Sequence, residues 1–263
     1  MKAAKPLISS TFSVLLDEPD LAIAKTSIEA DLKLLEGILQ HRPRDRALLE
    51  KAALGYFAYA FAFVEDIDTM RAQALYRRSR GFALRGLAAS GFDTTAVYGP
   101  LEGLDSAIMN ADRKAVPFAF WMALSWGMET FLRLDDPLLL ADLPRAEALM
   151  RFVRHTDSSY FFGGAPLFFG ALNGFRPRMF GGDTAISVRE FNACRSIAGE
   201  GFLLERVFRA RYLYVPMLDE QRFRSTLQEV LDAPDDILPG YRLLTAVAKA
   251  KARCYLARAA EWF

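Results

Sequence analysis

Apolar residues recur at helical spacing along almost the whole chain, whereas the alternation of apolar and polar residues that marks a strand never persists. Between Asp20 and Gln40 the apolar residues share one helix face, namely Leu21, Ile28, Leu32, Leu35 and Ile38. Asp20 follows Pro19 and is suited to cap this helix. The pattern predicts an all-α protein.

The same spacing predicts the other helices, which are separated by polar, glycine-containing or proline-containing segments. Their expected bounds are Arg46–Val64, Asp68–Ala88, Leu101–Met109, Pro117–Leu134, Leu143–His155, Ala165–Phe175, Thr184–Ile197, Phe202–Leu213, Asp219–Leu231 and Leu243–Trp262. Pro144 would then lie in the first turn of its helix, and both Trp121 and Trp126 belong in an interior. We expect residues 20–263 to form a single domain of stacked antiparallel helix pairs, after an N-terminal extension over residues 1–19.

The segment from Tyr160 to Asp183 is rich in glycine and aromatic residues and is predicted to form a helical hairpin. Pro166 suits the first turn of a helix, and Pro177 should end that helix near Phe175. Asp183 follows two glycines and can cap the next helix. The sequence GGAPLFFG is no phosphate loop, because no strand precedes it and no Gly-Lys-Ser/Thr follows it.

Three predicted helices share a signature in which a small residue, a large residue and another small residue follow at intervals of four and three. The three sets are Ala72-Tyr76-Ser79, Ala146-Met150-Val153 and Ser187-Phe191-Cys194. Small residues let a helix lie close to its partner, and the large one wedges between pairs. The signature predicts a divergent tetratricopeptide-like architecture, an α/α superhelix. Ordinary helix pairs are the alternative.

Charge and composition point to no polyanionic partner. The formal net charge is +1, from 33 basic and 32 acidic residues, so no global field attracts nucleic acid or an acidic membrane. Apolar runs are too short for a membrane span, and we expect a soluble protein. In the helix expected over residues 68–88, several arginines lie away from the apolar positions and are interpreted as a solvated face: Arg71, Arg77, Arg78 and Arg80.

Candidate catalytic and metal-binding groups are sparse. His41 and His155 are far apart and beside charged helix ends, which leaves little material for a zinc site or a catalytic triad. Carboxylates cluster at Glu65, Asp66 and Asp68 and at Asp135 and Asp136, where a cation or a helix cap could use them, and capping is favoured. Cys194 and Cys254 are interpreted as free buried thiols. No metal or cofactor is predicted.

Several motifs together resemble the T components of tripartite ATP-independent periplasmic (TRAP) transporters. They are DLKLLEGIL before Pro43, GYFAYAFAFVED, AQALYRRSRGFALRGL, FWMALSW, LPRAEALMRFV, YFFGGAPLFFGAL before RPRMFGGD, and LQEVLDAPDD. They extend in order from about Asp20 to the end of the chain. Arg176 and Arg178 depart from the family pattern, in which apolar residues or proline are more common there.

The resemblance implies a non-enzymatic, periplasmic protein, often lipid-anchored, that forms homo-oligomers, expected to be trimers, and docks a periplasmic solute-binding (P) component. The N-terminal residues contain no secretory apolar stretch and no lipid-attachment cysteine, although a mature-length chain would look the same. An internal channel could pass a hydrophobic or amphipathic solute. Its candidate lining residues are Tyr56, Tyr59, Trp121, Phe162, Phe168 and Phe169.

Two other functions stay open at this point. A generic tetratricopeptide module would capture a peptide in a concave groove lined by Arg, Lys or Asn, and would be monomeric. An all-α enzyme would gather titratable side chains in a pocket. The aromatic residues could also be core residues only, which is their usual role at helical spacing.

Overall fold

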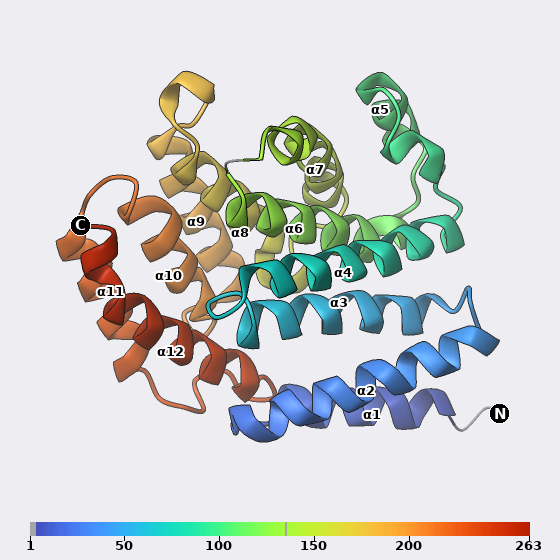
Figure 1. The fold of residues 1–263 in the computed structure, drawn as a ribbon, viewed down its shortest axis with the longest axis horizontal. Helices are drawn as coiled ribbons and strands as arrows, with labels where there is room; N and C mark the ends of the chain where they lie inside the picture. The colour runs from blue at the N-terminus through green and yellow to red at the C-terminus, as the bar shows by residue number, and fades with distance from the viewer. Residues whose placement is uncertain (1–3, 135) are drawn as a thin grey trace. The chain divides into compact units, whose positions relative to one another are not determined.

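The structure is a computed structural model that describes residues 4–134 and 136–263, and its regular elements are all helical (Figure 1). The all-α prediction is confirmed. Contacts divide the chain into two compact units. We call Ile28–Tyr160 the middle unit, and Met1–Ser27 together with Phe161–Phe263 the terminal unit. Among the described residues, no helix is both long and apolar enough to cross a bilayer.

The middle unit is a row of antiparallel neighbours in which α3 packs on α4, α4 on α6 and α6 on α7 (Figure 1). Helix α2 begins in the terminal unit and continues into the middle unit. The elements are α2 (Leu21–His41), α3 (Arg46–Phe63), α4 (Thr69–Ala89), the 3-10 turn η1 (Thr94–Val97), α5 (Leu101–Met109), η2 (Arg113–Ala115), α6 (Val116–Leu132) and α7 (Pro137–Thr156).

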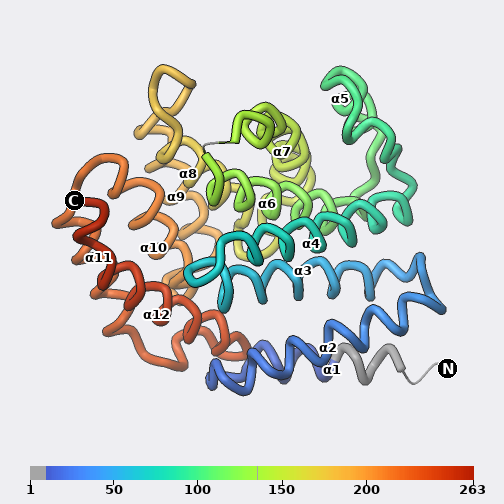
Figure 2. The backbone as a smooth tube through the Cα atoms, in the orientation of Figure 1, coloured from blue at the N-terminus to red at the C-terminus, as the bar shows by residue number. Residues whose placement is uncertain are grey.

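The terminal unit joins the two ends of the chain. Helix α1 packs against α12, and the guanidinium of Arg242 makes two hydrogen bonds of 2.9 Å to the carboxylate of Asp17. Figure 2 follows the chain through the other elements. They are α1 (Ala4–Leu16), α8 (Tyr160–Phe175), η3 (Arg178–Phe180), α9 (Thr184–Ala198), α10 (Leu204–Arg209), the π-helical turn η4 (Ala210–Tyr214), α11 (Glu220–Asp232), α12 (Arg242–Ala257) and η5 (Ala259–Glu261).

Aspartate side chains begin several helices where the sequence placed them. Asp20 accepts hydrogen bonds from the backbone N–H groups at the start of α2, and Asp68 does so at α4. Asp136 caps α7, and Asp183 caps α9. The capping role predicted for Asp68 and Asp136 is thus confirmed, because their carboxylates satisfy N–H groups that have no partner inside the helix. Asp135 lies outside the described residues.

All three signature sets are fully buried, each of their residues having 0% relative exposure. Ser79 on α4 donates a hydrogen bond of 2.8 Å to the carbonyl of Ala53 on α3, and Ser187 on α9 donates one of 2.6 Å to the carbonyl of Gly170 on α8. The small residues therefore bring paired helices close together, as predicted. The continuation of these pairs into a tetratricopeptide-like superhelix stays a prediction.

Several helix boundaries differ from the sequence prediction, most clearly at α7 and at the last helix, since α12 ends at Ala257 and not at Trp262. Helix α7 begins at Pro137, ahead of the expected start at Leu143, so Pro144 lies inside the helix. Pro144 is exposed, and so is Leu140, whose carbonyl would have received the missing N–H. Water can satisfy that carbonyl, which makes the interior proline tolerable. Helix α1 lies within the predicted N-terminal extension, where no helix was expected.

The aromatic segment that follows α7 starts with a left-handed turn. Phe161, Phe162 and Gly163 have φ values of 47°, 58° and 69°, so the regular part of α8 begins after them. Pro166 consequently lies in the first turn, as predicted, and α8 ends at Phe175. The Gly-Gly break was expected, but two phenylalanines in the left-handed region were not, because such backbone is rare outside glycine.

The predicted positions of the histidines and tryptophans are confirmed. His41 and His155 are exposed and lie at helix ends. Neither Cys194 nor Cys254 forms a disulfide among the described residues; Cys194 is buried as predicted, whereas Cys254 is only half-buried. Trp121 and Trp126 are buried in α6.

Candidate functional site

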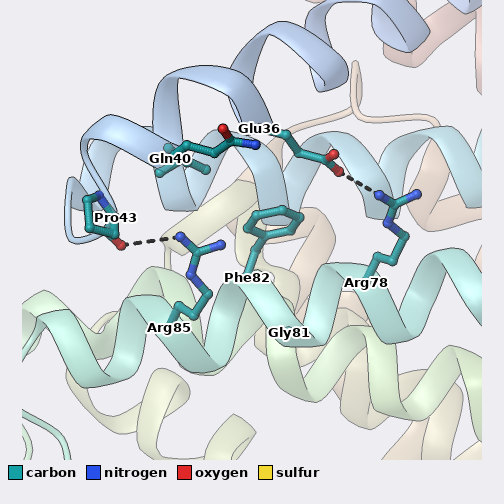
Figure 3. A pocket seen from close by; sticks show the side chains of 8 residues that line it. Glu36, Gln40, Pro43, Arg78, Gly81, Phe82 and Arg85 are labelled. Carbon is teal, nitrogen blue, oxygen red and sulfur yellow. Dashed lines mark hydrogen bonds and ion pairs between the residues drawn. The ribbon is translucent and has the colours of Figure 1, made fainter.

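A groove of about 580 Å³ lies between α2 and α4 in the middle unit (Figure 3). The lining residues are Glu36, Leu39, Gln40, Pro43, Arg78, Gly81, Phe82 and Arg85. Those on α4 are spaced by three and four residues, and so are those on α2, which places each set on one face of its helix. Pro43 follows the end of α2. Two helix faces that are distant in sequence thus form one groove.

Arginine and aromatic side chains alternate along this groove. The rings of Tyr56 and Phe82 are stacked, with centroids 5.6 Å apart and planes inclined by 6°. The guanidinium of Arg78 lies 4.7 Å from the centroid of the Tyr56 ring, and that of Arg85 lies 5.3 Å from the centroid of the Phe82 ring. Such cation–π contacts stabilise a positive charge on an aromatic surface. The groove therefore holds two cations beside apolar rings.

Glu36 is the acidic centre of the groove. It pairs with Arg78 at 2.7 Å and with Lys33 at 3.1 Å, and it accepts a hydrogen bond from the Tyr56 hydroxyl. Burial by itself would raise the pKa of the Glu36 carboxyl, but the hydrogen bonds from Tyr56 and Lys33 and the nearby cationic charges outweigh burial and lower that pKa. Burial, followed by the hydrogen bond to Glu36, raises the pKa of Tyr56. Glu36 is thus ionised and neutralised by its own neighbours.

Arg78 has a carboxylate partner in Glu36, whereas Arg85 has none among the described residues. The Nη2 of Arg85 donates to the backbone carbonyl of Pro43 at 3.4 Å, the long end of the range for such bonds (Figure 3). Within the part of the chain that the structure describes, no acidic side chain forms an ion pair with Arg85. The groove therefore carries one cation that the protein itself does not neutralise.

A second hollow, of about 500 Å³, lies around η1 and α5. Its main titratable group is Asp93, whose carboxylate accepts hydrogen bonds from the backbone N–H and hydroxyl of Thr95. These bonds lower the pKa of Asp93. Because the Asp93 carboxylate already caps η1, this hollow offers a ligand fewer charged groups than the α2–α4 groove does.

The predicted ligand residues of the middle unit fall in different surroundings. Tyr56 contacts the groove through Phe82 and Glu36. Tyr59 is buried, and its hydroxyl donates to Glu29, with Arg71 nearby. Trp121 lies in the core, where its Nε1 donates to the Tyr160 hydroxyl at 3.2 Å.

The predicted ligand residues of the terminal unit lie on α8. Phe168 and Phe169 are buried and meet edge to face, with ring centroids 5.4 Å apart. Phe162 is half-buried in the left-handed turn and stacks on Phe202 at 4.8 Å. The structure brings Tyr56 to the edge of a groove, and a ligand role for any of the six residues stays a prediction.

Arginines of α4 have more specific roles than the solvated face that was predicted. Arg71, Arg77 and Arg78 are exposed, but Arg80 is only 15% exposed at its side chain and lies over the Trp126 ring. Arg77 and Arg80 both pair with the fully buried Glu129 of α6. In the sequence, the spacing of Arg78, Phe82 and Arg85 on one face of α4 indicated half of the groove. Nothing in the sequence identified the face of α2 that forms the other half.

The terminal unit buries a second carboxylate in a similar way. Glu205 is 2% exposed and pairs with Arg195 at 2.8 Å and with Arg209 at 2.7 Å. Across residues 4–134 and 136–263, no group of three or more His, Cys, Asp or Glu side chains is arranged to hold a metal ion. Glu129 and Glu205 therefore form buried ion pairs, each with two arginines.

Comparison with known proteins gives the family. The family model described as "TRAP transporter T-component" matches residues 17–263, which is nearly the whole chain. The curated proteins searched contain no match to the chain. The matched range includes the whole middle unit with its groove, and the terminal unit from residue 17 onward. The chain belongs to the TRAP transporter T-component family.

Proposed function

We propose that this protein is a non-enzymatic accessory scaffold of a TRAP-type transport system, which oligomerises and docks a periplasmic solute-binding P component. The observation that carries the proposal is the family match over residues 17–263. The buried carboxylates Glu129 and Glu205 support the non-enzymatic part, because each is neutralised by two arginines and neither lines the groove. A periplasmic location and a trimeric state belong to the same proposal.

The turn η3 is a candidate contact surface for the P component. Met179 and Phe180 are 83% and 68% exposed, and Arg178 beside them is also exposed. Exposed apolar side chains rimmed by charge are typical of protein interaction sites. Arg176, on the other side of Pro177, is half-buried.

Sedimentation of the protein with the P component encoded beside it tests the docking proposal. We expect a complex, and we expect the double variant Met179→Ser, Phe180→Ser to weaken it. The matched control is Val188→Ser, which removes one exposed apolar side chain from α9. Absence of a complex at high concentration would refute docking, and an unchanged complex with the double variant would exclude η3 as the contact.

An internal channel for a hydrophobic or amphipathic solute is the finer part of the proposal. Tyr56, Tyr59, Trp121, Phe162, Phe168 and Phe169 would line it. Half-burial of Phe162 supports access at the left-handed turn, whereas the other five side chains would have to be reached through an oligomer or by rearrangement. Retention of a fluorescent fatty acid by the purified oligomer, lost in Phe162→Ala, would test this.

A second candidate function is a monomeric tetratricopeptide-like module that captures a peptide. The observation that favours it is the presence of Arg78 and Arg85 in a groove between two helices. Mass measurement in solution separates the candidates, since the transport scaffold is expected to be trimeric and the peptide module monomeric.

A further inference from the structure

The Arg85 guanidinium has hydrogen-bonding capacity that the protein leaves unused. A guanidinium carries five N–H donors, and within the described part of the chain Arg85 donates one hydrogen bond, the 3.4 Å contact with the carbonyl of Pro43. Hydrogen bonds between a guanidinium and a carboxylate are shorter and stronger than those to a neutral acceptor. A carboxylate entering the groove would therefore bind Arg85 better than Pro43 does.

The charge of the groove also favours an anion. Its charged lining residues are Arg78, Arg85 and Glu36, which leaves one positive charge in excess. Glu36 is already held by Arg78, Lys33 and Tyr56, so its repulsion of a second carboxylate is reduced. Arg85 lies two helical turns from Arg78 on the same face of α4, at the end of the groove nearer Pro43 (Figure 3).

The surface beside Arg85 is apolar. The Phe82 ring has Tyr56 stacked against it, Leu39 is 2% exposed, and Pro43 adds another apolar wall. At Gly81 an added Cβ would meet no atom within 4 Å, so the lack of a side chain there keeps the groove open. Gln40 supplies an amide at the rim. The groove of about 580 Å³ has the size of a small-molecule site.

We propose that the α2–α4 groove binds a small organic acid whose carboxylate pairs with Arg85 and whose apolar or aromatic part lies against Phe82 and Leu39. This site goes beyond docking and oligomerisation, and its occupancy does not depend on a P component. The same carboxylate chemistry could also come from the end of a peptide, so the experiment compares the two sources.

Isothermal titration calorimetry with 4-phenylbutyrate tests the site, with the neutral 4-phenylbutyramide as the ligand control. We expect saturable binding of the acid, weaker binding of the amide, and about tenfold weaker binding of the acid to Arg85→Gln. Gly81→Leu should abolish binding by filling the groove. Thermal unfolding of each variant confirms that it is folded.

Two control variants match these changes away from the groove. Gly103→Leu places the same side chain on α5 at another glycine with no atom within 4 Å, and Arg189→Gln removes an exposed arginine from α9. Both should bind 4-phenylbutyrate as the unmodified protein does. If no saturable binding is seen up to about 10 mM ligand, a concentration at which even a ligand with a millimolar Kd would bind, the proposal is overturned. Binding that Gly81→Leu leaves unchanged would overturn it as well. A peptide ending in phenylalanine that binds where 4-phenylbutyrate does not would also overturn it, in favour of a protein ligand.

Discussion

The helix pairs α3–α4 and α8–α9 carry the same small, large, small signature but make room for it differently. In the middle unit, the Tyr76 ring meets the Phe57 ring of α3, with centroids 5.4 Å apart. In the terminal unit, the Phe191 ring lies 3.0 Å from the position that a Cβ on Gly170 would occupy. One pair packs ring on ring, whereas the other packs a ring directly on glycine backbone.

The difference extends along α8. Four residues after Gly170, a Cβ on Gly174 would lie 2.5 Å from the carbonyl oxygen of Tyr212 and 2.7 Å from the Ser187 hydroxyl. The terminal unit also contains the left-handed turn before α8 and the π-helical turn after α10. The same signature is therefore compatible with ring-on-ring packing between α3 and α4 and with glycine-dependent packing between α8 and α9. We expect α8 to tolerate substitution of Gly170 and Gly174 poorly.

The largest expected effect is at the buried carboxylates. Glu205→Gln leaves Arg209, itself only 8% exposed, without its charge partner, and should lower the free energy of unfolding by about 3–5 kcal/mol. Glu129→Gln should cost less, because the side chain of Arg77 is 55% exposed and can turn to water. Urea unfolding of both variants measures the difference. Equal losses would show that the two units depend equally on their buried ion pairs.

Next in size is the substitution Gly174→Ala. The added methyl group would contact the backbone of Tyr212, which cannot move away as a flexible side chain could, so we expect a loss of about 2–3 kcal/mol in unfolding free energy. Gly81→Ala on α4 is the matched control, since its methyl group meets no atom and alanine favours the helix by about 1 kcal/mol. A stable Gly174→Ala protein would contradict glycine dependence in α8–α9.

A smaller effect is expected at the two helix-pairing serines. Ser79 donates to Ala53 and accepts from Ser125 at 2.8 Å, whereas Ser187 donates to Gly170 only. Ser79→Ala should therefore cost about 1–2 kcal/mol, and Ser187→Ala about 1 kcal/mol. The double variant Ser79→Ala, Ser125→Ala should recover part of the loss in denaturant titration, because no buried hydroxyl is left without a partner. If the loss in the double variant equals the sum of the losses in Ser79→Ala and in Ser125→Ala, the two serines are not coupled.

The smallest expected effect is a difference in the rates at which the two cysteines react with a thiol reagent, and it requires no change in stability. Burial raises the pKa of Cys194 to about 12, so its thiol stays protonated near pH 8, where the thiolate would be the reactive form. Iodoacetamide at pH 8 should modify the half-buried Cys254 before Cys194, as read by peptide mass spectrometry. In urea both should react. Rapid native labelling of Cys194 would indicate that the α8–α9 pair opens readily.

Much of the fold followed from the sequence because it depends on short-range order. Helical spacing, aspartate caps and the signature sets concern residues within a few positions of one another, and the structure confirms them at Asp20, Asp68 and Asp183. Membership of the family likewise followed from motifs in order along the chain. The contact of Arg80 with the Trp126 ring was missed, because it depends on how α6 packs against α4.

The sequence by itself determined that the chain is helical, where most helices begin, and which faces they bury, since each depends on the spacing of neighbouring residues. Only the tertiary structure decided that Arg78 meets Glu36, 42 positions earlier, while Arg85 meets no carboxylate among the residues that the structure describes. It also decided that Phe161 and Phe162 adopt the left-handed conformation. The physical reason is that these features arise from contacts between helices, which the pattern within one helix does not specify.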